Sequence, residues 1–228
     1  QDAYGELEGF AYAVSHDLKA PLRAIDGFSH LLVESVRDRL TTSEREYIER
    51  VRRGALRMSA LIDGLLAYSR VERRELHRKR VKLRELLDEV CAEHEEALAH
   101  CVLRCEVPDL TLHVDREALL IVLRNLLDNA LKFTRDTAQP SIEIGAHADD
   151  RYATIYISDN GIGFDPAYHD QIFSIFQRLD RNEQYAGTGI GLALARKAVQ
   201  RMDGRIWADS AVGQGATFYV ELPLVNRG

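Results

Sequence analysis

Hydrophobic residues recur at helical spacing through the first third of the chain. The first set predicts one amphipathic helix over about 7–36. Its apolar positions, each four residues from the next, are Phe10, Val14, Leu18 and Leu22. A polar segment follows, in which Ser43 and Glu46 have the spacing of a capping box. This pattern predicts that a second helix begins at Thr42 or Ser43.

The second helix carries apolar residues spaced alternately by three and four positions, the heptad spacing of coiled coils and helical bundles. These residues are Ile48, Val51, Ala55, Met58, Ile62 and Leu65. Two such helices joined by a short turn form an antiparallel hairpin, which buries only one face of each helix. Further apolar residues beside these seams would remain exposed: Leu31, Leu61, Leu66 and Tyr68. We therefore expect a homodimer, in which a second copy completes a four-helix bundle.

The segment at 69–85 is dense in Arg and Lys. A nucleic-acid patch is one interpretation, but cations at the C-terminal end of a helix followed by a solvated linker explain the pattern more simply. We place the domain boundary in this linker. The prediction is an all-α hairpin at 1–78 and a second domain at 79–228.

The second domain mixes helical and strand patterns. Helices are predicted at 84–100, 115–133 and 190–202, and strands at 101–107, 110–114, 140–148, 152–159, 204–210 and 216–224. Asp115 is placed to cap the long helix at 115–133. Because the strands are predicted to pair largely with sequence neighbours, with helices between them, we expect an α+β two-layer sandwich.

Three polar residues share one face of the long helix. Asn125, Asn129 and Lys132 stand at positions i, i+4 and i+7. Two amides and an ammonium in line could hold a magnesium ion and the phosphates that bridge it. A solvated helix face is the alternative, and this helix alone does not decide between them.

An acidic residue ends the predicted strand at 152–159. Asp159 alternates onto the same face as Ile155 and Ile157, so its carboxylate follows two apolar side chains toward the core. A buried charge there needs a donor, such as the exocyclic amine of an adenine. Gly161 and Gly163 would let the backbone pass close to a base. The alternative is a strand end that turns out to solvent.

A glycine-rich segment opens the helix at 190–202. Gly187, Gly189 and Gly191 could direct backbone donors at phosphates beside a helix N-terminus. A dinucleotide-binding fold also uses such a pattern, but it needs an apolar strand before the glycines, and the segment at 178–185 is polar. A later GQGATF segment fits a hairpin turn, from which Thr217 could point at a base.

A single histidine stands on the first predicted helix, away from its apolar stripe. His16 lies two residues from both Val14 and Leu18, so its side chain should point to solvent. An exposed neutral imidazole can act as a nucleophile or base, and Asp17 could orient it. A surface histidine beside an aspartate is also common without any function, so whether His16 is functional depends on what the rest of the chain contains.

The composition is that of an ordinary soluble protein, with 228 residues, 46% hydrophobic and 29% charged. A net charge of -6 argues against a nucleic-acid partner. No apolar run approaches the ~20 residues that cross a bilayer and no signal peptide opens the chain, so we expect a cytoplasmic protein without a membrane segment. Gln1 already stands in a helical pattern, and we expect a longer parent protein. The cysteines are expected to be free thiols rather than zinc ligands: Cys91, Cys101 and Cys105.

Four of these residue groups, around Asn125, Asp159, Gly187 and Thr217, resemble in chain order the N, G1, G2 and G3 boxes of a known ATP-binding domain. Sensor histidine kinases, gyrase-type ATPases and the ninety-kilodalton heat-shock chaperones share this domain. The segment IFSIFQRL, with Phe173 and Phe176, resembles the kinase F box. FAYAVSHDLKAPLR resembles the H box of the dimerisation and phosphotransfer domain, and its wording is most similar to phytochrome-like kinases. The resemblance covers nearly the whole chain and implies a sandwich of the GHKL or Bergerat type, with an upstream sensor module such as a phytochrome.

The resemblance also implies roles for single residues. His16 would be the phosphoacceptor and Asp17 would help to activate it. Asp159 would read adenine with Thr217 nearby, and the segment at 179–186 would form a lid over ATP. Asn125 and Asn129 would hold Mg²⁺. The remaining nucleotide contacts would come from Lys132, Gly161, Gly163, Arg178, Gly187, Gly189 and Gly191.

The resemblance implies an ATP-dependent protein-histidine kinase of a two-component system, which uses ATP and Mg²⁺. Such a kinase would pass the phosphoryl group from His16 to an aspartate of a response-regulator receiver domain. Candidate regulator contacts are Arg23, Asp26 and Gly27. A dimeric phosphatase or docking platform is an alternative, although Ala20 stands where many relatives have Thr or Asn. A gyrase-like ATP hydrolase is another, although Asn125 stands where those enzymes have a water-activating Glu. Ala216 stands where Thr is common, which removes one hydroxyl contact.

Overall fold

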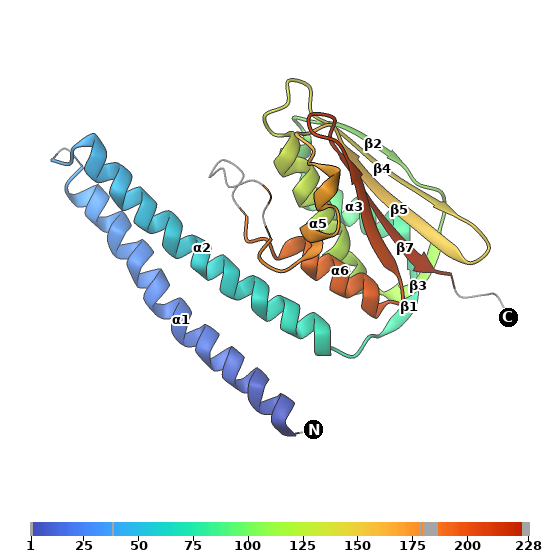
Figure 1. Cartoon of the computed structure of the whole chain (residues 1–228), viewed down its shortest axis with the longest axis horizontal. Helices are drawn as coiled ribbons and strands as arrows, with labels where there is room; N and C mark the ends of the chain where they lie inside the picture. The colour runs from blue at the N-terminus through green and yellow to red at the C-terminus, as the bar shows by residue number, and fades with distance from the viewer. Residues whose placement is uncertain (1, 38, 178, 180–186, 225–228) are drawn as a thin grey trace. The chain divides into compact units, whose positions relative to one another are not determined.

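The computed structural model describes the backbone of residues 2–37, 39–177, 179 and 187–224, and the side chains of these ranges from Asp17 onward (Figure 1). The chain divides into two compact units, 1–70 and 71–228. The last turn of the second helix therefore belongs to the second unit. Each unit is described below by itself.

The first unit is a helical hairpin. Helix α1 spans Asp2–Ser35 and helix α2 spans Thr42–Arg73, and the two run antiparallel (Figure 1). The turn between them is closed by Thr41 and Glu44. The Thr41 hydroxyl donates to the Glu44 carboxylate at 2.7 Å and accepts from the Glu44 N–H at 3.3 Å. The capping box thus lies two residues before the predicted pair Ser43 and Glu46, because Thr41 is the residue that directly precedes the first helical turn.

Ion pairs link the two helices of the hairpin, while few apolar side chains are buried there. Arg52 Nε donates to Asp26 at 3.0 Å, and Lys19 pairs with Asp63. Among the described side chains of this unit, only Leu22 and Ala55 are buried apolar residues. Large apolar side chains remain exposed, among them Phe28, which is 73% exposed, Leu31, Leu32 and Leu56. Three residues of the predicted seam are exposed as well: Val51, Met58 and Leu65.

The second unit is a two-layer α+β sandwich, as predicted. Its main sheet has the order β2-β4-β5-β7-β6, in which only the β2 and β4 pair is parallel. The strands are β2 Val102–Glu106, β4 Ser141–Ala148, β5 Tyr152–Asp159, β6 Arg205–Ser210 and β7 Ala216–Pro223. Strands β1 Arg78–Lys82 and β3 Thr111–Asp115 form a separate antiparallel pair.

Helices cover one face of the main sheet (Figure 1). They are α3 Leu83–Glu93, α4 Glu95–Leu98, α5 Arg116–Thr134 and α6 Gly191–Arg201, with 3₁₀ turns at Pro166–Tyr168 and Gln171–Phe173. Asp115 caps α5 as predicted, because its carboxylate accepts from Ala118 N–H at 2.9 Å. The apolar stripe of α5 packs against Ile155 and Ile157 of β5 in one continuous core.

Strand β1 occupies part of the segment predicted to be a solvated linker. Val81 is its one buried side chain, and it pairs with Leu112 of β3. The residues before β1 are also folded onto the second unit. Arg201 donates to the Val71 carbonyl at 2.7 Å, and the N–H of His77 donates to Asp115 at 2.8 Å.

Two further details differ from the pattern-based expectations. The helix predicted at 84–100 is interrupted at His94, which separates α3 from α4. Strands β2 and β3, which are neighbours in sequence, lie in different sheets. The three cysteines are free thiols and half-buried.

Candidate functional site

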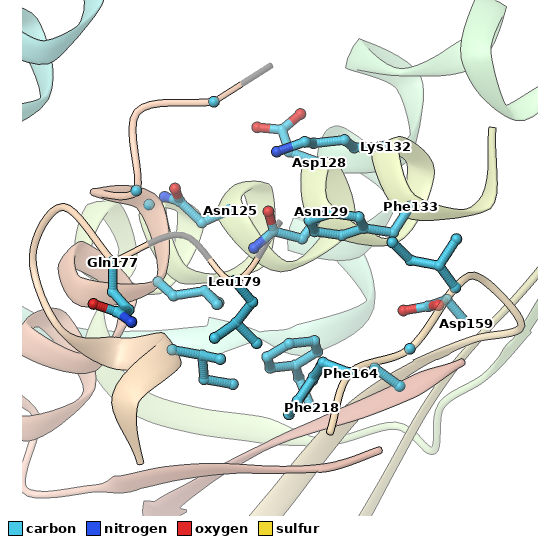
Figure 2. Close-up of a pocket in the computed structure, with 18 of the residues that line it drawn as sticks. Asn125, Asp128, Asn129, Lys132, Phe133, Asp159, Phe164, Gln177, Leu179 and Phe218 are labelled. Carbon is cyan, nitrogen blue, oxygen red and sulfur yellow. The ribbon is translucent and has the colours of Figure 1, made fainter. Parts of the chain in front are cut away.

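A cavity of about 410 Å³ lies between α5, the N-terminal end of α6, the end of β5 and the segment that follows β5 (Figure 2). Residues from each of the four nucleotide-box patterns line it. The lining consists of Asn125, Asp128, Asn129, Lys132, Phe133, Asp159, Ile162, Gly163, Phe164, Ile172, Gln177, Leu179, Gly187, Thr188, Gly189, Gly191, Leu192, Ala216 and Phe218.

One end of the cavity is polar and is built by α5. Helical spacing places Asn125, Asn129 and Lys132 along the same side, as predicted. The Asn125 amide nitrogen donates to the Ile121 carbonyl at 2.6 Å, which directs its oxygen toward the start of α6. A Cβ atom at Gly191 would lie 2.4 Å from that oxygen, so a side chain there would displace the Asn125 amide. The geometry therefore presents an amide oxygen, a ligand that suits Mg²⁺.

Lys132 is the cationic residue of this end of the cavity. Its ammonium nitrogen lies 4.6 Å from the centre of the Phe133 ring. A Cβ atom built at Gly187 would approach that nitrogen to 2.7 Å. A side chain at position 187 would therefore crowd the ammonium group.

The other end of the cavity holds a buried carboxylate. Asp159 is only 8% exposed, and it accepts from the Gly161 N–H at 2.9 Å. Burial raises the pKa of Asp159 to about 6, although the backbone N–H groups of Gly161 and Ala216 oppose this. A carboxylate oxygen can accept more than one hydrogen bond, so Asp159 could also accept from the exocyclic amine of a base.

Apolar side chains flank this carboxylate. The centres of the Phe164 and Phe218 rings are 6.3 Å apart (Figure 2). Behind them, Phe173 meets Phe218 edge to face at the same separation. Ile162 and Leu179 complete the apolar part of the lining. A cavity with one buried acceptor among aromatic rings and a cationic, amide-rich far end fits a purine nucleotide, with the base at Asp159 and the phosphates at Lys132.

Glycines shape the backbone around Asp159. Gly163 has φ +60°, and a Cβ atom there would lie 2.1 Å from the Ala211 carbonyl oxygen. At Gly161 a Cβ atom would lie 2.4 Å from the Phe133 carbonyl oxygen. Gly161 is not itself among the lining residues, but it supplies the donor that holds Asp159 in place.

The structure brings eight of the predicted nucleotide residues to one cavity: Asn125, Asn129, Lys132, Asp159, Gly163, Gly187, Gly189 and Gly191. It does not bring Thr217 there. The register pairs Asp159 with Ala216, so Thr217 pairs with Ser158 on the opposite face of the sheet, where their hydroxyls are 2.8 Å apart. Ala216 lines the cavity instead.

Some predicted residues fall outside this description. Arg178 and most of the predicted lid, at 180–186, lie outside the described residues. The backbone of His16 belongs to α1, but its side chain lies outside the part that the structure describes. Asp17 is exposed on the same helix.

Several lining residues were not predicted from sequence. Asp128, Phe133 and Gln177 adjoin predicted site residues in the sequence, and this adjacency was the only sequence feature that could have indicated their place in the lining.

The two phenylalanines of the F box differ in their exposure. Phe173 is buried against Phe218, whereas Phe176 is exposed, with φ +65°, and donates its N–H to the Gly189 carbonyl at 2.9 Å.

Two protein families match consecutive parts of the chain. Residues 114–226 match the family described as histidine kinase-, DNA gyrase B- and HSP90-like ATPase, and residues 6–74 match the His Kinase A (phospho-acceptor) domain. The chain belongs to the sensor histidine kinases. The family resemblance expected from the boxes is thereby confirmed, and the match at 6–74 includes His16.

Relatives of this sensor kinase chain include cyanobacterial phytochromes. It is 36% identical to cyanobacterial phytochrome A of Nostoc sp. over 97% of its own length and 29% of that protein. It is 32% identical to the phytochrome-like protein Cph1 of Synechocystis sp., over 97% of its own length and 30% of that protein. The chain thus spans less than a third of the length of these relatives.

Solved structures support the same architecture. Full-length ShkA in complex with AMPPNP superposes with a TM-score of 0.71 at 26% identity, over 96% of this chain and 46% of that one.

In the part of the kinase chain that the structure describes, no helix is both long and apolar enough to cross a bilayer. The same part contains no cluster of three or more His, Cys, Asp or Glu side chains suited to a metal ion.

Proposed function

We propose that the chain is the catalytic core of an ATP-dependent protein-histidine kinase of a two-component system. The supporting observation is a single cavity that combines the buried carboxylate of Asp159 with the Asn125, Asn129 and Lys132 side chains. Asp159 would accept from the adenine amine, and Lys132 would contact the phosphates. Asn125 and Asn129 would hold Mg²⁺, which would neutralise phosphate charge.

The proposed reaction moves the γ-phosphoryl group of ATP to His16. A ring nitrogen of His16 attacks the γ-phosphorus, the bond to the bridging oxygen breaks, and ADP leaves with the electron pair of that bond. Asp17 would orient the imidazole and stabilise its positive charge. Phosphoryl transfer depends mainly on positioning and on charge neutralisation, which the residues of this pocket would supply for the nucleotide. Arg178 would add a γ-phosphate contact.

The second proposed step passes the phosphoryl group from His16 to an aspartate of a response-regulator receiver domain, with Arg23, Asp26 and Gly27 as candidate contacts. We propose that the hairpin acts as a homodimer, because its exposed apolar side chains need a partner surface. The cyanobacterial phytochrome relatives support an upstream light-sensing module. The reaction is proposed to take place in the cytoplasm, where ATP is available.

The test is to incubate the purified chain with Mg²⁺ and γ-labelled ATP, beside His16→Ala. We expect acid-labile, alkali-stable label on the parent and none on the variant. Label that persists on His16→Ala would contradict the assignment of the acceptor. Tight ATP binding without any label would instead favour a phosphatase or docking role for this chain.

A further inference from the structure

A histidine outside the nucleotide boxes contacts the rim of the cavity. His94 lies at the break between α3 and α4. Its Nε2 is 2.8 Å from Oδ1 of Asp128, which lines the cavity, and its Nδ1 is 2.7 Å from the Val90 carbonyl oxygen. The His94 side chain is only 17% exposed, whereas that of Asp128 is 63% exposed.

Both ring nitrogens of His94 therefore face acceptors. A carbonyl and a carboxylate can only accept, so both contacts are hydrogen bonds only when both nitrogens carry a proton. Burial opposes the charged ring, but the hydrogen bonds to Val90 and Asp128 outweigh it and raise the pKa of His94. The geometry thus favours an imidazolium beside Asp128.

The position of Asp128 makes this neutralisation important. Asp128 precedes Asn129 and stands four residues before Lys132, a spacing at which an acidic and a basic side chain attract each other on a helix. Figure 2 shows the Asp128 carboxylate and the Lys132 ammonium on the same side of α5. An uncompensated carboxylate here would repel the phosphates of a nucleotide and would compete with them for Lys132.

The His94 contact is the last of a series of charge pairs between α3 and α5. Arg116 pairs with Glu89 near the start of α5, and Arg124 Nε donates to Glu93 at 2.7 Å further along. His94 and Asp128 continue this series toward the cavity. Helix α3 and the residue that follows it thus supply a charge partner for each of these three positions of α5.

We propose that His94 is a positioning residue of the nucleotide site, which holds and neutralises the Asp128 carboxylate so that Lys132 can serve the phosphates. This role deepens the proposed kinase function and rests on it. A purely structural role for His94, closing the end of α3 through Val90, is the alternative. Only the first role predicts that the effect of removing His94 depends on the charge of Asp128.

The experiment measures the binding of a non-hydrolysable ATP analogue with Mg²⁺ to the whole chain by calorimetry. We expect His94→Ala to weaken binding about three- to tenfold, a modest effect because Asp128 is largely exposed to solvent. Asp128→Asn should bind about twofold more tightly than the parent, because a negative charge is removed from the rim. The double variant His94→Ala with Asp128→Asn should match Asp128→Asn.

The control is His147→Ala, which removes an exposed histidine of β4 outside the cavity lining and should bind as the parent does. If His94→Ala does not fold, His94→Gln takes its place, since glutamine can donate to Asp128 but carries no charge. The proposal is overturned if the His94 variant binds within twofold of the parent, if the double variant is as weak as the single one, or if Asp128→Asn binds more weakly than the parent. A parent chain that binds no nucleotide would contradict the proposed function itself, and the role of His94 with it.

Discussion

The two units of this chain bury their apolar side chains to very different extents. The second unit has a continuous core that spans the main sheet, α3, α5 and α6, and its cavity is built entirely from its own residues. The first unit buries only Leu22 and Ala55 among its described side chains and exposes Phe28, Val51 and Met58. The described lining of the cavity thus lies within one copy, whereas the hairpin exposes apolar side chains that we propose a second copy covers.

The largest effect is expected from placing charges on the hairpin. Val51→Glu combined with Met58→Glu should turn a dimer into a monomer and weaken self-association about 100-fold or more, because each copy would bury two unpaired carboxylates. Sedimentation or light scattering reports the mass, and Trp207 fluorescence on β6 reports whether the second unit stays folded. The matched control is Val212→Glu, at an apolar residue of the second unit that is 71% exposed. A parent chain that is already monomeric would contradict the proposed dimer.

The next effect concerns Asp159 and affects stability and binding in opposite directions. Asp159→Asn should weaken ATP binding about 10- to 100-fold, because an amide nitrogen would replace an acceptor facing the adenine amine. At pH 7 the same change should raise the free energy of unfolding by about 1 to 3 kcal/mol, because it removes a buried charge. Calorimetry and denaturant unfolding measure the two quantities.

The pH dependence follows from the raised pKa of Asp159. Its folded value of about 6 lies above the ordinary value of 3.8, so the folded chain holds the extra proton between these values. The contribution of this group to stability is therefore most favourable at low pH and is lost as the pH rises through that window. Asp159→Asn should remove this part of the pH dependence. An unchanged stability profile would contradict the raised pKa of Asp159, and parent-like ATP affinity at pH 7 would contradict its placement at the base.

These outcomes depend on features that sequence patterns predict to different degrees. Long periodic elements are well predicted: β5 was expected at 152–159 and is observed as Tyr152–Asp159, and α5 differs by one residue at each end. Strand β1 was not predicted, because four of its five residues are charged and only Val81 is buried. Pairing with β3, about thirty positions away, is what makes this segment a strand.

The site shows the same division between local and long-range information. Spacing along α5 was enough to group Asn125, Asn129 and Lys132. The side of the sheet that Thr217 faces depends on the register of β7 against β5, and a shift of one residue reverses every side chain. The contact of His94 with Asp128 joins residues 34 positions apart, one between α3 and α4 and the other on α5, which no local pattern reveals.

A smaller effect on stability is expected at Gly163, a glycine whose backbone conformation the fold requires. Gly163→Ala should lower the free energy of unfolding of the second unit by about 2 to 3 kcal/mol, because φ is +60° there and a Cβ atom would lie 2.1 Å from the Ala211 carbonyl oxygen. Denaturant unfolding followed by Trp207 fluorescence measures this. Parent-like stability would show that this backbone segment can rearrange at no cost.

The smallest effect is expected at Gly54, a glycine in the interior of α2. A Cβ atom there meets nothing within 4 Å, so within one copy Gly54→Ala should stabilise the helix by about 0.5 to 1 kcal/mol. Melting of the helical circular dichroism signal measures this, with Trp207 fluorescence as the control for the second unit. A destabilised hairpin together with weaker self-association would instead indicate that a second chain approaches the backbone at Gly54. The sign of this one substitution therefore tests whether the open space seen in a single copy stays open in the assembled bundle.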